Sequence, residues 1–334
     1  MPKEASFYIR EGEEKIHCQL CPHHCRISPG NVGFCGVRKN EGGTLICLNY
    51  GHAVAANADP IEKKPLFHFL PGTDAYSIAT VGCNMRCDHC QNYHISQVRG
   101  NVRGERLEPS EVVDRAGKTG CSTIAYTYTE PTIFYEYARD TARLGEEEGL
   151  ANVFVTNGYI EEEPLRDISP VLDAANVDLK SFSDDFYREV AGASLEPVLR
   201  TIRLMVELDI WVEVTTLFIP GLNDSEDEMR KIAEFIAEVD PSIPWHISRF
   251  RPAHNMTDRA PTPVEKMRKA KEIGEEEGLR FIYHGNVPGK GESTYCPECG
   301  EEIISRFGFS VQSKRLQDER CPDCGEEIEG VWSR

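Results

Sequence analysis

Three cysteines in the middle of the chain have a spacing that suits a metal centre. Cys83, Cys87 and Cys90 form a C-x3-C-x2-C pattern directly after the apolar stretch 76–81, which is typical of a strand. Thiolates hold iron–sulfur clusters, usually four to a cluster, so three closely spaced cysteines can leave one iron open. The alternative is zinc, but zinc sites usually take four ligands in two C-x2-C-type pairs. His89 would be the fourth ligand, and its place between Cys87 and Cys90 makes that awkward.

An open iron suits one particular chemistry. It can chelate the amino and carboxylate groups of S-adenosylmethionine (SAM), and an electron from the cluster can then break a bond at the sulfonium. Cleavage releases methionine and a 5′-deoxyadenosyl radical, which abstracts a hydrogen atom. The cofactor carries the difficult step, so the protein has to position and shield it.

The elements around the three cysteines alternate between strand-like and helix-like patterns. Short apolar or β-branched stretches predict strands at 76–81, 122–127, 152–156, 176–179, 211–219, 245–250 and 280–283. Helices are predicted at 131–149, 225–239 and 263–278, the second with Ser225 as N-cap and Glu228 at the capping-box position. This alternation indicates an α/β fold with a parallel sheet, and the number of units favours a full or partial (β/α) barrel. Active sites of such barrels lie at the C-terminal ends of the strands.

Polar segments follow several of the predicted strands, in chain order. They are Tyr128-Thr129-Glu130-Pro131, Thr156-Asn157-Gly158, Asp178-Leu179-Lys180 and Pro252-Ala253-His254. Each has an ordinary structural explanation: a helix start, a turn, a surface ion pair and a loop histidine. Their shared position after strands nevertheless favours one common site with Cys83, Cys87 and Cys90.

Two further cysteine groups flank this core. The tail contains Cys296-Pro297-Glu298-Cys299-Gly300 and Cys321-Pro322-Asp323-Cys324-Gly325, which is the pattern of a zinc ribbon; a rubredoxin-like iron site has the same spacing. The leader contains Cys18, Cys21, Cys25 and Cys35, with His23 and His24 as alternative ligands. For the leader, structural zinc is slightly favoured over a second, electron-relaying cluster.

The order of motifs in the core resembles the radical SAM superfamily, and in particular pyruvate formate-lyase activating enzymes. The resemblance implies that the cluster is a [4Fe–4S] cluster bound by Cys83, Cys87 and Cys90. It also implies SAM contacts, which fall here on His89, Thr129, Glu130, Asn157, Asp178, Lys180 and His254. Thr129 stands where the superfamily's GGEP-type segment has glycine. The contacts that the backbone of that segment makes with SAM are therefore only partly implied for this chain. His89 stands where many members carry an aromatic residue that packs on the adenine.

Over the full length, the chain resembles the AmmeMemoRadiSam system radical SAM proteins. The residues that carry this resemblance are the leader cysteines with Gly33-Phe34-Cys35-Gly36, Cys90-Gln91-Asn92, Gly285-Asn286-Val287-Pro288-Gly289, the tail knuckles and Gly330-Val331-Trp332. It implies Memo-like and AMMECR-like proteins as partners, together with an electron donor. It does not name a substrate.

Three functions follow as hypotheses. The first is a radical SAM enzyme of oxidoreductase type, the second a glycyl-radical enzyme activase, and the third a non-catalytic scaffold stabilised by zinc. Activases with extra cysteines usually carry them inside the core, whereas here they flank it, which favours the first hypothesis.

Composition and charge set the remaining expectations. The 334 residues carry a formal charge of −18, which disfavours nucleic-acid binding. We expect a cysteine-rich segment at 1–70, the core at 71–286 and a zinc-ribbon-like tail at 287–334. The N-terminus lacks the apolar stretch of a secretory signal, and no segment suits a membrane span, so we expect a cytoplasmic location. The cytoplasm is reducing, so the thirteen cysteines indicate metal ligands rather than disulfides.

Overall fold

A large, mainly parallel sheet forms the centre of the computed structural model, which describes residues 3–12, 14–287 and 291–334. In this described part the strand order is β16-β15-β14-β13-β12-β11-β9-β8. The parallel strands are β9 (Asp74–Ala79), β11 (Thr123–Tyr126), β12 (Ala151–Thr156), β13 (Ala174–Asp178), β14 (Trp211–Phe218), β15 (Trp245–Arg249) and β16 (Ile282–Gly285). The antiparallel β8 (Ala55–Pro60) lies at the edge against β9. No pairing between described residues closes the sheet, so the predicted α/β partial barrel is confirmed.

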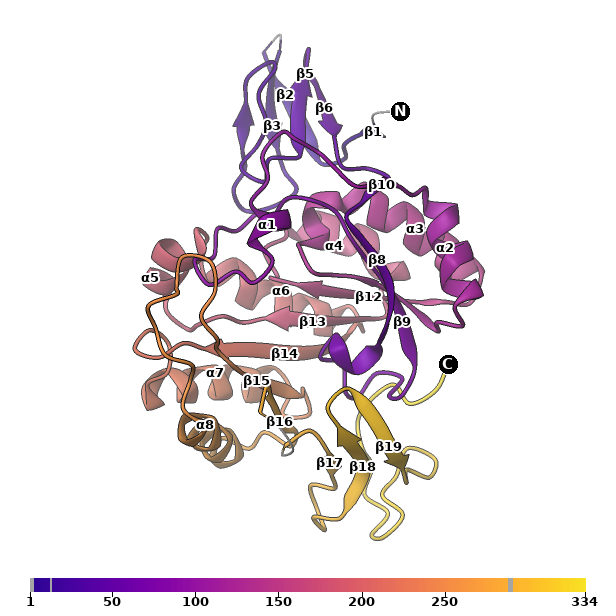
Figure 1. The fold of residues 1–334 in the computed structure, drawn as a ribbon, viewed down its shortest axis with the longest axis vertical. Helices are drawn as coiled ribbons and strands as arrows, with labels where there is room; N and C mark the ends of the chain where they lie inside the picture. Colours follow the sequence, from indigo (N-terminus) through magenta and orange to yellow (C-terminus); the bar gives the residue numbers. More distant parts are fainter. Residues whose placement is uncertain (1–2, 13, 288–290) are drawn as a thin grey trace.

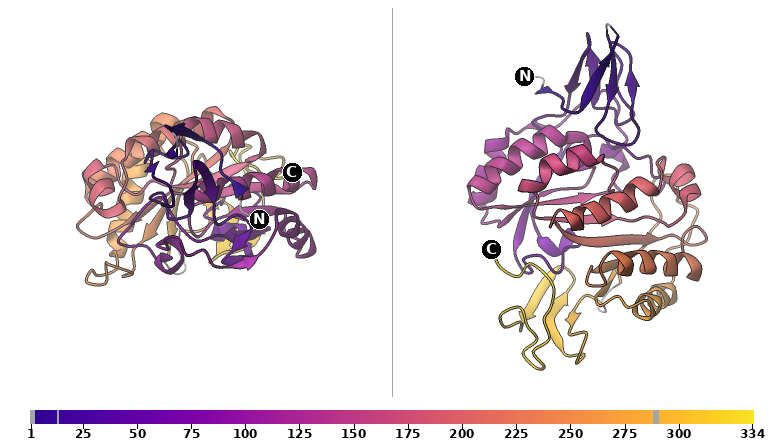
Figure 2. Two further views of the ribbon diagram at one scale, coloured as in Figure 1. Left: turned by 90° about the horizontal axis from the view of Figure 1, so that it is seen from above. Right: turned by 180° about the vertical axis from the view of Figure 1, so that it is seen from behind.

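Helices connect the strands and lie over one face of the sheet, as the right-hand view of Figure 2 shows. The longer ones are α2 (Pro109–Lys118), α3 (Tyr135–Glu147), α4 (Glu162–Ile168), α6 (Glu196–Glu207), α7 (Glu226–Val239) and α8 (Val264–Glu276). Short turns of helix are α1 (Tyr93–Ser96), α5 (Asp184–Phe186), η1 (Ile61–Lys63), η2 (Pro131–Phe134), η3 (Ser169–Val171) and the π-helical η4 (Tyr187–Ala191). Among the described residues, no helix combines the length and the apolar character that a membrane crossing requires.

The predicted elements of the core are present, with corrections at their ends. All seven predicted strands exist, and their bounds differ by no more than two residues. The helix predicted at 131–149 begins as the 3-10 turn η2 before α3 continues it. Ser225 caps α7 by accepting from the backbone N–H of Glu228 at 3.2 Å. The predicted capping box is wrong, because the Glu228 carboxylate accepts from Ser181 Oγ and Phe182 N instead.

The leader is built of small antiparallel sheets rather than loops. One pairs β2 (Tyr8–Glu11), β3 (Lys15–Cys18) and β4 (Arg26–Ile27), and another pairs β1 (Lys3–Glu4), β6 (Thr44–Cys47) and β5 (Arg38–Glu41). β7 (His52–Ala53) pairs with β10 (Glu105–Arg106). These sheets could not be predicted from the sequence, because strands of two to four residues are too short to show the alternation that a sequence pattern needs.

The tail lies at the end of the molecule opposite the leader sheets (Figure 1). It contains β17 (Thr294–Tyr295), β18 (Glu302–Phe307) and β19 (Ser310–Lys314). Its last residues return to the segment before β9, where Leu70 N donates to Val331 O at 2.7 Å. Of the segment Gly285-Asn286-Val287-Pro288-Gly289, Pro288 and Gly289 lie outside the described residues.

A buried ion pair fastens the leader to the core. Arg38 of β5 donates from Nη2 to the Glu136 carboxylate of α3 at 2.6 Å, and both side chains are almost fully buried. Burial by itself would lower the pKa of Arg38, but Glu136 holds it above its usual value. The second Glu136 oxygen accepts from Ser6 N at 2.7 Å. The pair therefore connects three segments that are distant in the sequence.

We expect Glu136→Ala to lower the free energy of unfolding by about 3–5 kcal/mol, because it leaves a buried guanidinium without its counter-charge. Urea unfolding followed by circular dichroism measures the change. The matched control is Asp227→Ala, which breaks an exposed pair with Lys231 and is expected to cost no more than about 0.5 kcal/mol. Equal effects of the two substitutions would contradict this prediction.

Candidate active site

The C-terminal ends of the parallel strands open onto one cavity of ≈ 340 Å³. This lies within the usual size of cofactor sites, roughly 300–1,000 Å³. Each parallel strand, or the loop after it, contributes to the lining, which includes Cys83, Cys87, His89, Cys90, Tyr128, Thr129, Asn157, Asp178, Lys180, Thr215, Leu217, Ser248 and Asn286. Most of the residues that were predicted to share one site at the strand ends therefore line the same cavity.

The three central thiols lie on the loop between β9 and α1. Met85 N donates to Cys83 Sγ at 3.3 Å, and Cys90 Sγ lies 3.2 Å from Ser96 Oγ. Burial raises the pKa of Cys83 well above its usual value, with the Glu130 carboxylate adding to the rise, and burial raises that of Cys87 to about 11. Thiols of this kind become good ligands only when a metal stabilises the thiolate.

The spacing of these thiols fits a cluster better than a single ion. Among the described residues, Cys83, Cys87 and Cys90 do not form a group whose ligand atoms all lie within 4.8 Å of one another, whereas the tail cysteines do. Three thiolates on one zinc would have to be that close. Thiolates that each bind a different iron of a [4Fe–4S] cluster stand farther apart. The residues present therefore fit a cluster.

Glu130 lies behind the cavity wall rather than in it. Its carboxylate accepts from Thr132 N at 3.0 Å, from Thr156 Oγ1 at 2.8 Å and from Asn157 N at 2.8 Å. Burial raises the pKa of Glu130, and these hydrogen bonds oppose the rise. Its neighbours Tyr128 and Thr129 line the cavity instead. The geometry makes Glu130 a positioning residue for Asn157, and its direct contact with SAM stays a prediction.

Asn157 links the loop after β12 to the cysteine loop. Its Nδ2 donates to Asn84 Oδ1 at 2.9 Å and lies 3.7 Å from Cys83 Sγ. Asn84 in turn donates to Tyr159 O at 2.7 Å. An amide beside a cluster ligand fixes its orientation and favours its charged form.

Asp178 and Lys180 form an ion pair in the cavity wall, with Lys180 Nζ 2.8 Å from Asp178 Oδ2. Burial alone would lower the pKa of Lys180, but Asp178 and then Cys87 hold it above its usual value. Lys180 is thus a fixed positive charge beside the thiols, and Asp178 is the more exposed partner.

Replacing Lys180 with methionine is expected to raise the Kd for SAM about tenfold or more, because a charge-assisted hydrogen bond to the SAM carboxylate would be lost. Anaerobic calorimetric titration of the reconstituted protein measures this. Lys231→Met, on the exposed face of α7, removes the same charge away from the cavity and is expected to leave the Kd unchanged. An unchanged Kd in Lys180→Met would contradict the predicted role.

The two predicted histidines occupy different environments. His89 lines the cavity, is buried, and its Nδ1 has no hydrogen-bond partner within the described chain. Its expected packing on adenine stays a prediction. His254 is not among the lining residues: it stacks on Tyr93 with ring centres 4.5 Å apart. The loop that carries His254 contacts the cysteine loop through Asn255 N, which donates to Asp88 O at 2.9 Å.

A second cavity of ≈ 470 Å³ adjoins the first. The two share Lys63, Gln91, Thr215, Ser248 and Asn286 as lining residues. The rest of its wall includes Glu62 of η1, His246 and Tyr283 of the sheet, and Gly308 and Phe309 of the tail hairpin. This cavity could not be predicted from the sequence, because its walls come from segments that no local pattern relates to one another.

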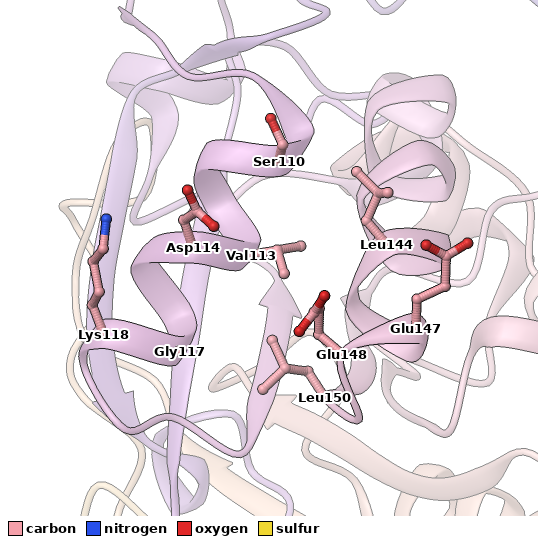
Figure 3. A pocket seen from close by; sticks show the side chains of 9 residues that line it. All are labelled: Ser110, Val113, Asp114, Gly117, Lys118, Leu144, Glu147, Glu148 and Leu150. Carbon is pink, nitrogen blue, oxygen red and sulfur yellow. The ribbon is translucent and has the colours of Figure 1, made fainter.

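Figure 3 shows another hollow, of ≈ 460 Å³, between α2 and α3. It is lined by polar and acidic side chains such as Asp114, Glu147 and Glu148, and its lining contains no thiol. It shares no lining residue with the cavity at the strand ends. It lies in the helical layer, apart from the candidate site.

The four tail thiols form a compact group. Cys296 Sγ lies 3.6 Å from Cys324 Sγ, and Cys299 Sγ lies 3.7 Å from Cys321 Sγ. Four thiolates at about 2.3 Å from one zinc would stand roughly 3.8 Å apart. Both knuckles close in the same way, with Gly300 N donating to Cys296 O and Gly325 N to Cys321 O at 2.9 Å. These four thiols are thus placed to hold one metal ion, and all thirteen cysteines of the chain are free thiols.

Comparison with known proteins assigns the family. Residues 77–236, which include the central thiols and most of the other cavity residues, match the model of the Radical SAM superfamily. Residues 77–236 form a radical SAM domain. Such a domain implies a [4Fe–4S] cluster and SAM, which agrees with the thiol spacing and with the cavity.

Relatives of the chain differ in how much of it they match. An uncharacterized protein of Methanocaldococcus jannaschii is 46% identical over 320 residues, 95% of each chain. The pyruvate formate-lyase 1-activating enzyme of Escherichia coli is 24% identical over 219 residues, 60% of this chain and 89% of that one. The first relative therefore also spans the leader and the tail.

Solved structures share the fold of the core. A radical SAM methyltransferase from Sphaerobacter thermophilus superposes with a TM-score of 0.52 at 19% identity, over 66% of this chain and 68% of that one. SuiB of Streptococcus suis bound to S-adenosylmethionine superposes with a TM-score of 0.52 at 12% identity, over 68% and 53%. At these identities the likeness concerns the fold alone.

Proposed function

We propose that this protein is a radical SAM enzyme of oxidoreductase type, which reductively cleaves SAM and abstracts a hydrogen atom from a substrate. The observation that carries the proposal is the position of Cys83, Cys87 and Cys90, whose loop opens onto the same cavity as polar side chains from the other strand ends. When bound there, a [4Fe–4S] cluster supplies the electron that breaks the sulfonium–C5′ bond of SAM.

The residues of the chain would have three tasks in this reaction. The cysteines would hold three irons and leave the fourth for SAM. Lys180, fixed by Asp178, would bind the SAM carboxylate, and Asn157 would keep Cys83 in place. The buried walls would keep water from the radical, which is the protein's usual contribution to such chemistry.

The substrate belongs, in our proposal, in the second cavity and is a small polar molecule. The tail hairpin forms part of that cavity's wall through Gly308 and Phe309, so the space beside the SAM cavity is partly covered. Polar groups from Lys63, Thr215 and Ser248 stand where the two cavities meet. A radical formed in the first cavity would thus lie close to a molecule bound in the second.

A second candidate is a glycyl-radical enzyme activase. It is supported by the likeness to pyruvate formate-lyase 1-activating enzyme, at 24% identity. An activase must admit a loop of a partner protein to the cavity, and the position of the tail hairpin disfavours this. A non-catalytic scaffold, which the sequence also allowed, would make no use of the cavity residues.

Anaerobic reconstitution, reduction with dithionite and addition of SAM test the proposal. We expect 5′-deoxyadenosine, measured by liquid chromatography, in amounts that exceed the protein concentration when substrate is present. No 5′-deoxyadenosine from a fully reconstituted protein would favour the scaffold. A glycine-centred radical on a partner protein, seen by electron paramagnetic resonance, would favour the activase.

Two additional roles complete the proposal. The tail thiols would hold structural zinc, which the sulfur spacing of 3.6 and 3.7 Å supports. The motif order along the whole chain supports membership of the AmmeMemoRadiSam system, with Memo-like and AMMECR-like proteins as partners.

A further inference from the structure

The leader thiols line one small void of ≈ 10 Å³. Cys18, Cys21, Cys25 and Cys35 all line it, and most of the remaining wall is apolar. Burial raises the pKa of Cys18 to about 11 and that of Cys21 well above its usual value, and neighbouring leader thiols add to both shifts. Such a wall offers water few hydrogen-bond partners, but it offers four soft ligands to a metal.

The spacing of these thiols differs from that in the tail. The tail sulfurs lie within 4.8 Å of one another, whereas in the described part of the chain no three of the leader sulfurs meet this limit. The leader therefore resembles the central site, where each thiolate would bind a different iron. From this spacing we infer that Cys18, Cys21, Cys25 and Cys35 hold a second [4Fe–4S] cluster rather than zinc.

Arg38 provides an independent indication of a charged occupant. It lines the same void and is only 1% exposed. Its Nη2 binds Glu136, but its buried Nε has no hydrogen-bond partner within the described chain. A cluster with four thiolates is an anion whose sulfur atoms can accept that N–H, and a buried donor without an acceptor is costly.

Two contacts bring this site directly against the central cysteine loop. His23 lines the leader void, and its Nε2 lies 2.7 Å from the backbone oxygen of Asn84, the residue after Cys83. On the other side, Arg86, the residue before Cys87, donates from Nη2 to Phe34 O. His23 and Arg86 therefore each connect the leader site to the central cysteine loop.

Arg86 contacts residues of both sites. Its guanidinium lies 4.4 Å from the ring centre of Phe34, the residue before Cys35, and its Nη1 donates to Cys83 O at 2.9 Å. One side chain thus lies close to ligands of both sites.

This arrangement suits a one-electron relay, a role that rests on the proposed function. A one-electron carrier of the ferredoxin or flavoprotein class would reduce the leader cluster by one electron. That electron would pass to the central cluster and then to SAM, where the sulfur–C5′ bond breaks into methionine and the 5′-deoxyadenosyl radical. The carrier ends one electron more oxidised, and both clusters return to their initial state. Zinc has no redox chemistry and would not support this transfer.

Metal analysis tests the assignment without using activity. We replace all three central cysteines with alanine, reconstitute the protein anaerobically and count iron and zinc. The expected content is about four irons and one zinc per chain, with a paramagnetic cluster signal after reduction. The wild type is expected to hold about eight irons and one zinc. Two zinc ions per chain and no iron in the triple variant would overturn the inference.

A second measurement tests the proximity of the two sites. In the variant Cys18→Ser/Cys21→Ser, only the central cluster remains. The triple variant keeps only the leader cluster. If both clusters exist and lie close together, the paramagnetic resonance spectrum of the fully reduced wild type should be broader than the sum of the spectra of the triple and the double variant. A wild-type spectrum equal to that sum would overturn the relay.

The outcomes for the two proposals are separable. Formation of 5′-deoxyadenosine by the wild type, together with an iron-free triple variant, rejects the second cluster and keeps the enzyme. Iron in the triple variant, with no 5′-deoxyadenosine from the wild type, keeps the second cluster and rejects the enzyme.

Discussion

Replacing Cys87 with alanine lowers the rate of 5′-deoxyadenosine formation at least about a hundredfold. Even residues that only support metal ligands typically cost 10–100-fold when changed, so the loss of a ligand should cost no less. Cys87 is buried, and its loop is fixed by Cys90 N donating to Cys87 O at 3.1 Å, so alanine removes the ligand with little other change. The rate is measured with dithionite as reductant and saturating SAM.

Cys121→Ala is the matched control for this prediction. Cys121 is also a buried cysteine, but it lies before β11, where its Sγ is 3.3 Å from Thr119 Oγ1. We expect the control to keep the wild-type rate and iron content. A wild-type rate in Cys87→Ala would show that the central thiols are not the source of the chemistry.

Removing two of the four tail thiols, which we propose to hold zinc, is expected to unfold the tail locally. Structural zinc contributes about 10–16 kcal/mol to the folding of small metal-bound modules, and this tail has only a small core of its own. Cys299 and Cys324 are exposed, so replacing both with serine removes ligands without disturbing packing. Hydrogen exchange followed by mass spectrometry should show loss of protection at Ile303 and Ile304, which are fully buried in the intact protein.

The control for the tail experiment is Ser313→Ala, an exposed position of β19 in the same hairpin. It should leave hydrogen exchange unchanged. Zinc analysis should find one ion per chain in this control and none in the double variant, as expected for a single four-thiolate site. Wild-type protection of Ile303 and Ile304 in the zinc-free double variant would contradict a structural role for the metal.

The sequence predicted best where a physical period repeats. Buried parallel strands followed by amphipathic helices leave a strong local pattern, so the central sheet was predictable to within two residues of each strand end. The position of Cys83, Asn157 and Lys180 followed from this, because parallel strands bring their C-terminal ends to one edge. The grouping of the four tail thiols was predictable from the spacing of the cysteines alone.

The features that were missed depend on contacts between distant segments. The carboxylate of Glu130 is directed to Thr132, Thr156 and Asn157, which no motif indicates. Glu228 turns away from its own helix start toward Ser181, because that loop offers two donors. The second cavity requires η1, three strands and the tail to meet, and this is a property of the folded chain only.

The wall of the second cavity has a consequence for the history of the protein. The side chains that would hold SAM come from the strands of the core, whereas Gly308 and Phe309 come from a module with its own metal site. Under the proposed placement of the substrate in the second cavity, exchange of that module by recombination would alter substrate choice and leave SAM cleavage untouched. The two properties would then be open to selection as separate traits.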